Sequence, residues 1–181
     1  WAHLRDEAFE VYGDDERLGP ETLGRLRYAA AVVHESLRLH PAGSFSPRQT
    51  TTEVRVGDYV IRKNAMVLWS PYLAGHDAHA WDRPLEFRPE RHLEPSPEDA
   101  ARMDAAWVPF GKGPRRCIGF ALAQMELTLI LARLAHRIDL SAVDPATPAP
   151  VGVVVNRPSG GVRVVLRRDS GDVDAMVPTS R

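Results

Sequence analysis

Apolar residues recur with helical spacing over the first forty residues. A charged, glycine-rich segment from residue 13 to residue 19 divides this region into two helical stretches. In the second stretch, four apolar residues recur about every 3.6 residues and predict the buried stripe of an amphipathic helix. They are Leu26, Ala30, Val33 and Leu37. Pro41 ends this helix, because the residue before a proline is disfavoured in helical geometry.

After this proline the pattern changes to short strands. Val54–Val56 and Tyr59–Ile61 flank the dipeptide Gly57-Asp58, which predicts a tight hairpin turn. Met66–Trp69 is a third strand-like run. The middle of the chain is therefore expected to form small antiparallel sheets.

The second half of the chain contains four further predicted segments. Five prolines between residues 84 and 109 predict irregular structure there. From Ile118 to about His136 the sequence is helical and apolar on nearly every side, which predicts a helix buried in a larger body. Residues 151–155 and 162–166 predict a final hairpin. The polar tail, residues 170–181, is expected to be disordered.

Composition limits the class of protein. The chain has 181 residues, 44% of them hydrophobic, and a formal net charge of -1, which suits roughly one globular domain. The near-zero net charge gives no electrostatic support for nucleic acid or an anionic membrane as the main partner. A single cysteine cannot close an internal disulfide, so a secreted disulfide scaffold is excluded. The longest apolar run, residues 118–132, is too short to span a bilayer.

The single cysteine lies in the sequence FGKGPRRCIG, residues 110–119, directly before the apolar helix. Two glycines and a proline turn the backbone sharply, so Cys117 is expected at the N-terminus of that helix. There, unpaired N–H groups and the positive end of the helix dipole stabilise a thiolate, the form that binds metals. The alternative for a lone cysteine is an inert, small apolar side chain.

Glu35 and Arg38 form a second candidate constellation, Glu-x-x-Arg, on the helix that ends before Pro41. Residues three apart are neighbours on a helix surface and can form an ion pair. Tyr28 and Ala31 share their side of the helix, and apolar residues occupy the opposite side. We therefore expect a buried pair, which needs a further partner.

Together these motifs resemble the cytochrome P450 family. Residues 110–119 match its haem-ligand signature, Phe-x-x-Gly-x-Arg-x-Cys-x-Gly, and residues 35–38 match its Glu-x-x-Arg motif. The order of helix pair, proline-rich loop and cysteine is also the same. The resemblance implies a mainly α fold with small β-sheets (α+β), with residues 1–181 forming the C-terminal, haem-binding part of the cytochrome P450 fold.

The resemblance implies haem b (iron protoporphyrin IX) as cofactor, with Cys117 as the proximal ligand of the haem iron. Phe110 matches the aromatic residue that packs against the thiolate side. Arg115 matches an arginine that binds a haem propionate, and Arg48 matches a second such position. For Arg48 the alternative is a solvated arginine at a strand edge. The signature glycines complete the implied cofactor-binding set: Gly113 and Gly119.

In the family, the arginine of a Pro-Glu-Arg-Phe segment completes the Glu-x-x-Arg pair. This chain has RPERH at residues 88–92, which assigns that role to Arg91 and departs from the pattern at His92. The resemblance thus implies that Glu35, Arg38 and Arg91 form a structural ion network without a catalytic role. Loss of the aromatic residue leaves the packing around Arg91 in question.

The implied function is a haem-thiolate monooxygenase that inserts one oxygen atom of O2 into a C–H bond of a small hydrophobic substrate. Residues 42–46 and 151–155 align with stretches that line the substrate cavity in relatives, although ordinary core packing would look the same. A ferredoxin- or flavodoxin-type redox partner with its reductase is implied, and no nucleic acid. Lys112 and Arg116 lie on the cysteine side, where relatives dock an acidic redox protein; a solvated loop is the alternative.

Two other functions remain open. One is a noncatalytic remnant or interaction fragment that does not hold haem. The other is an enzyme with Cys117 as nucleophile, for which no matching histidine or asparagine motif is visible.

The resemblance also implies that the chain is an incomplete part of the enzyme. The family's earlier helices are missing, including the long one that crosses the other face of the haem. We therefore expect the apolar helix to be exposed in the isolated chain. We expect a cytoplasmic location and leave open a membrane anchor upstream of Trp1.

Overall fold

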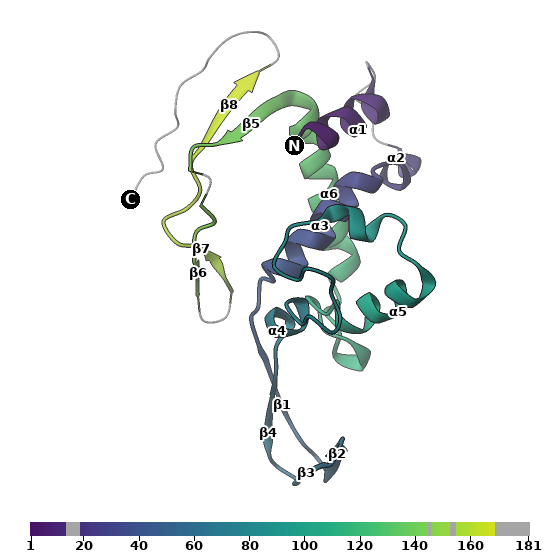
Figure 1. Cartoon of the computed structure of the whole chain (residues 1–181), viewed down its shortest axis with the longest axis vertical. Helices are drawn as coiled ribbons and strands as arrows, with labels where there is room; N and C mark the ends of the chain where they lie inside the picture. Colours follow the sequence, from purple (N-terminus) through teal and green to yellow (C-terminus); the bar gives the residue numbers. More distant parts are fainter. Residues whose placement is uncertain (14–18, 145, 153–154, 169–181) are drawn as a thin grey trace.

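The computed structural model describes residues 1–13, 19–144, 146–152 and 155–168. Its helices gather in one body, from which small two-stranded sheets extend (Figure 1). The helices are α1 (Ala2–Tyr12), α2 (Pro20–Arg25), α3 (Arg27–Leu39), α4 (Pro71–Gly75), η1 (Pro89–His92), α5 (Pro97–Ala106), η2 (Gly113–Arg115) and α6 (Phe120–Arg137). The strands are β1 (Ser46–Gln49), β2 (Val54–Val56), β3 (Tyr59–Ile61), β4 (Met66–Trp69), β5 (Ile138–Ala142), β6 (Pro150–Val151), β7 (Arg157–Pro158) and β8 (Val164–Arg168). The tail predicted to be disordered, residues 170–181, lies outside the described residues.

The core lies where α1, α3 and α6 meet. Its buried members are Leu4, Ala8, Tyr12, Leu26, Ala29, Ala132 and Ala135. Leu4, Ala8 and Tyr12 recur every four residues, so a single stripe of α1 enters the core. The small alanines of α3 and α6 let these two helices approach closely.

Charged side chains of α1 satisfy the ends of the two longer helices. The Glu7 carboxylate accepts hydrogen bonds from the backbone N–H groups of Tyr28 (2.6 Å) and Ala29 (2.8 Å), in the first turn of α3. Arg5 Nη1 donates to the carbonyl of Ala135, in the last turn of α6 (3.2 Å). A carboxylate at an N-terminus and a guanidinium at a C-terminus complement the helix dipole. These bonds orient α3, which carries the ion network, relative to α6.

The middle strands form the arm that extends downward from the helices in Figure 1. The predicted hairpin is confirmed, because β2 pairs antiparallel with β3 across Gly57-Asp58. The third predicted run is strand β4. Its partner, β1, was not predicted, since its sequence Ser-Pro-Arg-Gln lacks the apolar alternation of a strand.

The prediction of irregular structure throughout residues 84–109 is wrong, because η1 and α5 lie within this segment. Proline begins each of these helices rather than breaking it. In α5, Pro97 occupies the first helical position, where its missing N–H is not needed. The Ser96 side chain caps the helix by accepting a hydrogen bond from the backbone N–H of Asp99 (3.1 Å).

The predicted final hairpin is also wrong. Residues 164–168 form β8, which pairs antiparallel with β5, and Val151 in β6 pairs with Arg157 in β7. Strand β5 follows α6 directly and offers β8 a partner of equal length, with Leu140 opposite Leu166. Residues 153–154 of the predicted first strand lie outside the described residues.

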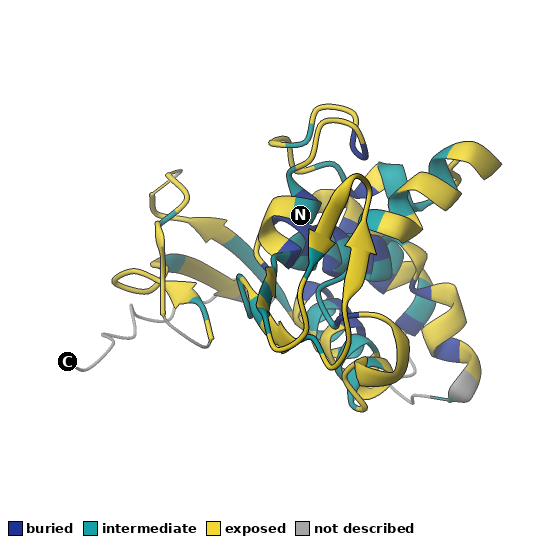
Figure 2. Cartoon of the chain, turned by 90° about the horizontal axis from the view of Figure 1, so that it is seen from below, coloured by how far each residue is buried: buried dark blue, intermediate teal, exposed yellow. Residues whose placement is uncertain are grey.

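The apolar helix predicted from residue 118 is confirmed as α6, but it is not buried on every side. Its buried residues are Thr128, Ala132 and Ala135. Ile130 is 57% exposed and Leu122 is 54% exposed, and Figure 2 shows how much of the helical body is open to solvent. This exposure agrees with the expectation for an incomplete part. In the part of the chain that is described, no helix is long and apolar enough to cross a membrane.

Gly75 is required where α4 meets α3. A Cβ at this position would lie 2.3 Å from the backbone carbonyl oxygen of Arg38, which a rigid helix cannot move aside. Gly75→Ala is therefore expected to lower the free energy of unfolding by about 2–3 kcal/mol. Gly24→Ala in α2 is the matched control, because a Cβ there meets nothing within 4 Å. Equal urea unfolding curves for the two variants would contradict the close approach of Gly75 to the Arg38 carbonyl.

Candidate functional site

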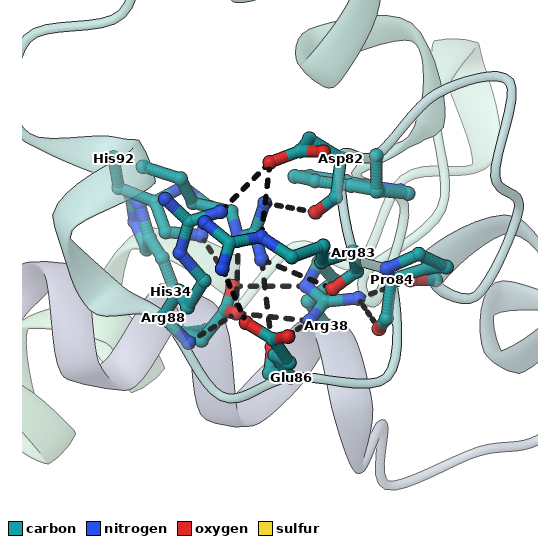
Figure 3. Close-up of polar contacts among 12 residues, drawn as sticks. His34, Arg38, Asp82, Arg83, Pro84, Glu86, Arg88 and His92 are labelled. Atoms are coloured by element: carbon teal, nitrogen blue, oxygen red, sulfur yellow. Dashed lines mark hydrogen bonds and ion pairs between the residues drawn. The ribbon is translucent and has the colours of Figure 1, made fainter.

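Glu35, on α3, is the shared acceptor of a buried ion network. Figure 3 shows the polar contacts of this region, with Arg38, Arg88 and His92 among the labelled residues. One carboxylate oxygen, Oε1, accepts hydrogen bonds from Arg38 Nη2 (2.9 Å), Arg91 Nε (3.1 Å) and the backbone N–H of Arg88 (2.8 Å). The other, Oε2, accepts from Arg38 Nε and His92 Nε2, both at 2.9 Å. The Glu35 and Arg38 side chains are 0% exposed. A fully buried carboxylate is tolerable because its acceptor sites are satisfied and its charge is paired.

Arg38 connects three separate segments. Besides its two bonds to Glu35, the guanidinium donates to the carbonyl oxygens of Gly75, Pro84 (2.7 Å) and Glu86 (3.1 Å). Its cationic carbon lies 5.1 Å from the centre of the Trp81 ring. Arg38 therefore braces α3 against α4 and the loop that leads to η1.

Arg91 and His92 bring η1 into the same network. Arg91 Nη1 also donates to the carbonyl of Asp82 (2.8 Å), and its side chain is 7% exposed. At the position of the family's aromatic residue, His92 is 8% exposed, with its ring 6.0 Å from the Trp81 ring. The departure from the family pattern thus adds a polar contact to Glu35 and keeps an aromatic ring in the packing.

The hydrogen bonds around Glu35 control its ionisation. Burial alone would raise its pKa, but hydrogen bonds from His92, Arg38 and the Arg88 backbone hold the pKa below its usual range. Glu35 is therefore charged at neutral pH. Its contribution to stability is present above its ordinary pKa of about 4.5 and is lost as the pH falls below that value.

Acid is expected to weaken the fold before Glu35 titrates, because burial and the neighbouring His92 lower the pKa of His34 to about 4. Between its ordinary pKa, 6.5, and 4, the unfolded chain binds a proton that the folded chain excludes. The free energy of unfolding should fall by about 2–3 kcal/mol over this range, because each pKa unit contributes about 1.4 kcal/mol and each titration is only half complete at its own pKa. Urea unfolding at several pH values measures this slope. His34→Phe should reduce this pH dependence without abolishing it, since burial also lowers the pKa of His40. An unchanged slope in His34→Phe would contradict the role of His34 in the acid sensitivity.

Cys117 lies in a tight loop between η2 and α6. Its backbone N–H donates to the carbonyl of Phe110 (2.9 Å), which closes the loop. Gly113 has a φ of 69°, a left-handed conformation that other residues adopt only with strain. The cysteine lies two residues before Gly119, the N-cap of α6, and its thiol is free and exposed. The prediction of a cysteine just ahead of the helix is confirmed.

The arm lies against this loop through Trp69. A Cβ on Gly111 would lie 3.5 Å from the Trp69 ring, so the loop backbone passes close to β4. The guanidinium of Arg48, on β1, lies 5.8 Å from the centre of the same ring. Arg48 is exposed and donates to Ser46 Oγ (2.9 Å) and the Pro47 carbonyl (2.8 Å). Arg115, at the end of η2, is exposed too.

The surroundings of the thiol suit an amphipathic iron complex such as haem. A soft sulfur ligand is open to solvent, and a Cβ at Gly119 would lie 4.0 Å from its Sγ atom, in space that the glycine leaves free. Ile118, next to the cysteine, is fully exposed and offers apolar surface. The exposed guanidinium groups of Arg48 and Arg115 suit carboxylates. The residues present therefore fit the group that the resemblance implies.

Lys112 and Arg116, the candidates for docking a redox protein, are both engaged within the chain. Lys112 Nζ forms an ion pair with Asp104 Oδ2 (2.8 Å). The Arg116 guanidinium lies 3.5 Å from the centre of the Phe120 ring. Both residues are nevertheless exposed.

The two segments predicted to line a substrate cavity are joined by Asn156. Its backbone N–H donates to the Ala42 carbonyl (2.6 Å), and its side-chain amide contacts Ser44 Oγ. A cavity of about 290 Å³ lies beside this junction, lined by Pro41, Tyr72 and Val162 among others. Its lining includes neither Cys117 nor any predicted ligand of the cofactor.

Sequence reasoning missed His34, Gly75 and Asn156. Their partners are distant in the chain: Gln124 Nε2 lies 2.8 Å from His34 Nε2, and Gly75 contacts Arg38. No local pattern marks such residues. Only the departure at His92, three residues after the proline of its segment, signalled an unusual network.

Comparisons with known proteins agree on one family. Residues 2–162 match the family model described as Cytochrome P450. Oryzalexin D synthase from Oryza sativa subsp. japonica is 38% identical over 141 residues, which cover 76% of this chain and 28% of that protein. Cytokinin hydroxylase from Arabidopsis thaliana is 34% identical over 167 residues, which cover 91% of this chain and 32% of that protein.

A solved structure shows the same fold. The retinoic acid-bound cyanobacterial CYP120A1 aligns with a TM-score of 0.80 and 25% identity, covering 92% of this chain and 39% of that one. The mainly α fold with small β-sheets is therefore confirmed. The chain spans only about a third of the length of these relatives.

Proposed function

The chain belongs to the cytochrome P450 family, and we propose from this premise that it is the C-terminal, haem-binding part of a haem-thiolate monooxygenase. The observation that carries the proposal is the exposed Cys117 thiol, held in a closed loop by the bond from its N–H to Phe110. When bound, haem supplies the activation of O2, of which one oxygen atom enters a C–H bond of a small hydrophobic substrate. The names of relatives such as ent-cassadiene C11-alpha-hydroxylase 1 from Oryza sativa subsp. japonica support this chemistry.

In this proposal the chain's own residues bind and orient haem b. Cys117 provides the thiolate ligand of the iron, and Phe110 packs beside the sulfur and restricts access of water to it. Arg115 and Arg48 hold the propionates through charge-assisted hydrogen bonds. Gly113 shapes the loop and Gly119 leaves space next to the thiol, which its lack of a Cβ supports.

Glu35, Arg38 and Arg91 serve as a structural ion network, without contact to the reacting atoms. Their burial supports this role, because groups that are almost completely enclosed by protein do not meet a substrate. Their effect is to fix α3, α4 and η1 relative to one another. The Cys117 loop is thereby held on a rigid base.

The electrons come from a ferredoxin- or flavodoxin-type partner with its reductase, and O2 is the second substrate. Exposed cations near the cysteine, Lys112 and Arg116, suit an acidic docking surface. We place the protein in the cytoplasm, where a lone cysteine stays reduced.

The activity belongs to a longer protein of which residues 1–181 are a part, which the coverage of about a third of the relatives supports. A second candidate is a noncatalytic fragment that holds no haem. This candidate is supported by the apolar side chains of α6 that remain exposed to solvent among the described residues.

Haem loading distinguishes these functions. The chain is mixed with haemin, reduced and exposed to carbon monoxide, and its Soret band is recorded. A strongly red-shifted, thiolate-type band is the expected result. A histidine-type band, or no uptake of haemin, would contradict the ligand role of Cys117 and favour the noncatalytic fragment.

A further inference from the structure

His34 contacts both flanks of the segment that carries Cys117. Its backbone carbonyl accepts a hydrogen bond from Trp107 Nε1 (3.0 Å), and the two rings are 4.7 Å apart. On the other flank, Gln124 Nε2 lies 2.8 Å from His34 Nε2. Trp107 lies ten residues before Cys117 and Gln124 seven after it. One residue of α3 therefore spans the two ends of the loop.

Short paths lead from both contacts to the cysteine. The Trp107 ring lies 6.1 Å from the Phe110 ring, and the Phe110 carbonyl accepts the Cys117 N–H. Gln124 lies in the second turn of α6, which begins three residues after Cys117. A shift of either flank would move the loop backbone, because the intervening segment is short and closed by its own hydrogen bond.

The state of the His34 ring suits this contact. Burial and the neighbouring His92 lower the pKa of His34 to about 4, so the ring is neutral at pH 7. A neutral ring has one acceptor nitrogen, and Nε2 accepts from the Gln124 amide while Nδ1 carries the proton. The adjacent residue, Glu35, is fixed by five hydrogen bonds, so the backbone that carries His34 is rigid.

We propose that His34 is a positioning residue that holds the Cys117 segment against α3 through Trp107 and Gln124. The effect of this positioning on iron binding rests on the proposed function of Cys117. The contacts of His34 to both flanks of the loop do not depend on that function, so the positioning role and the ligand role can be refuted separately.

Two variants on opposite sides of one contact test the proposal in the full chain. His34→Phe keeps a ring beside Trp107 but removes the acceptor, and Gln124→Leu removes the donor. Amide hydrogen exchange of the Cys117 N–H is expected to become roughly tenfold faster in each, which is about 1.4 kcal/mol of local opening. The double variant should exchange no faster than either single one, because both remove the same bond. His79→Phe, at an exposed histidine outside the site, is the matched control and should change nothing.

A spectroscopic readout separates positioning from general stability. In a titration with haemin, the concentration that gives half of the thiolate-type band should rise by up to about tenfold in His34→Phe, which is the same 1.4 kcal/mol expressed as a loss of affinity. His34→Gln should restore the affinity, because its amide oxygen also accepts a hydrogen bond. Unchanged exchange at Cys117 in both single variants would overturn the proposal. A parent chain with no thiolate-type band would overturn the proposed function, while the exchange test of His34 would still hold.

Discussion

A Cys117→Ser variant loaded with haemin is expected to lack the red-shifted, thiolate-type Soret band entirely. A serine hydroxyl does not ionise near neutral pH and cannot replace the soft thiolate as a ligand of iron. The fold should be nearly unaffected, because the thiol is exposed and the backbone bond to Phe110 remains. We expect the free energy of unfolding to change by no more than about 0.5 kcal/mol. The measurement is the carbon monoxide spectrum of the reduced protein together with a urea unfolding curve.

The control for this experiment is an exposed histidine, since histidine is the other side chain that readily binds haem iron. His79→Ala should leave the thiolate-type band unchanged. A band that survives in Cys117→Ser would mean that another group had produced it. A band lost in both variants would point to a general failure of haem uptake and would refute the specific role of the cysteine.

The second large effect is expected at Glu35. Glu35→Gln keeps the size of the side chain and removes the charge that pairs with Arg38 and Arg91. Removing one partner of a buried ion pair leaves an uncompensated buried charge, which costs about 3–5 kcal/mol. Because small domains are stable by only about 5–15 kcal/mol, the variant should melt at a much lower temperature or fail to fold. Thermal unfolding followed by circular dichroism measures this loss.

An exposed pair of the same chemistry provides the control. Arg27 and Glu94 form an ion pair at 3.3 Å, with side chains 61% and 82% exposed. Glu94→Gln should cost at most about 1 kcal/mol, because solvent screens the pair. Similar losses for Glu35→Gln and Glu94→Gln would show that burial of the network contributes little.

The loss of stability in His92→Phe should lie between those of Glu35→Gln and Glu94→Gln, since this variant removes one of the five hydrogen bonds to Glu35 and keeps an aromatic ring.

Local sequence was enough to predict the elements whose signals are contained in a few residues. The turn at Gly57-Asp58 and the helix α3, which ends before Pro41, are confirmed because turn chemistry and helical periodicity act over short distances. The prolines that begin η1 and α5 were misread, because proline can break a helix or begin one. The context that distinguishes the two is the cap, Ser96 in α5, rather than the proline itself.

Strand pairing at the end of the chain shows a different limit. The apolar runs were visible, but which run pairs with which depends on how α6 delivers β5 to β8. Hydrophobic alternation alone cannot choose between partners of similar character. The predicted hairpin therefore agreed with the local sequence but had the wrong strand pairing, because β8 pairs with β5.

The cysteine, its glycine-rich loop and the Glu-x-x-Arg pair were readable in the sequence because their members lie within a few residues of one another. Family membership and the candidate ligand Cys117 followed from that local information. Tertiary structure decided the rest: the five hydrogen bonds that converge on Glu35, the contact of His92 with that carboxylate, and the position of His34 between Trp107 and Gln124. Apart from the two bonds within the Glu35–Arg38 pair, these contacts join residues more than fifty positions apart, and such distances close only when α3, η1 and α6 pack against one another.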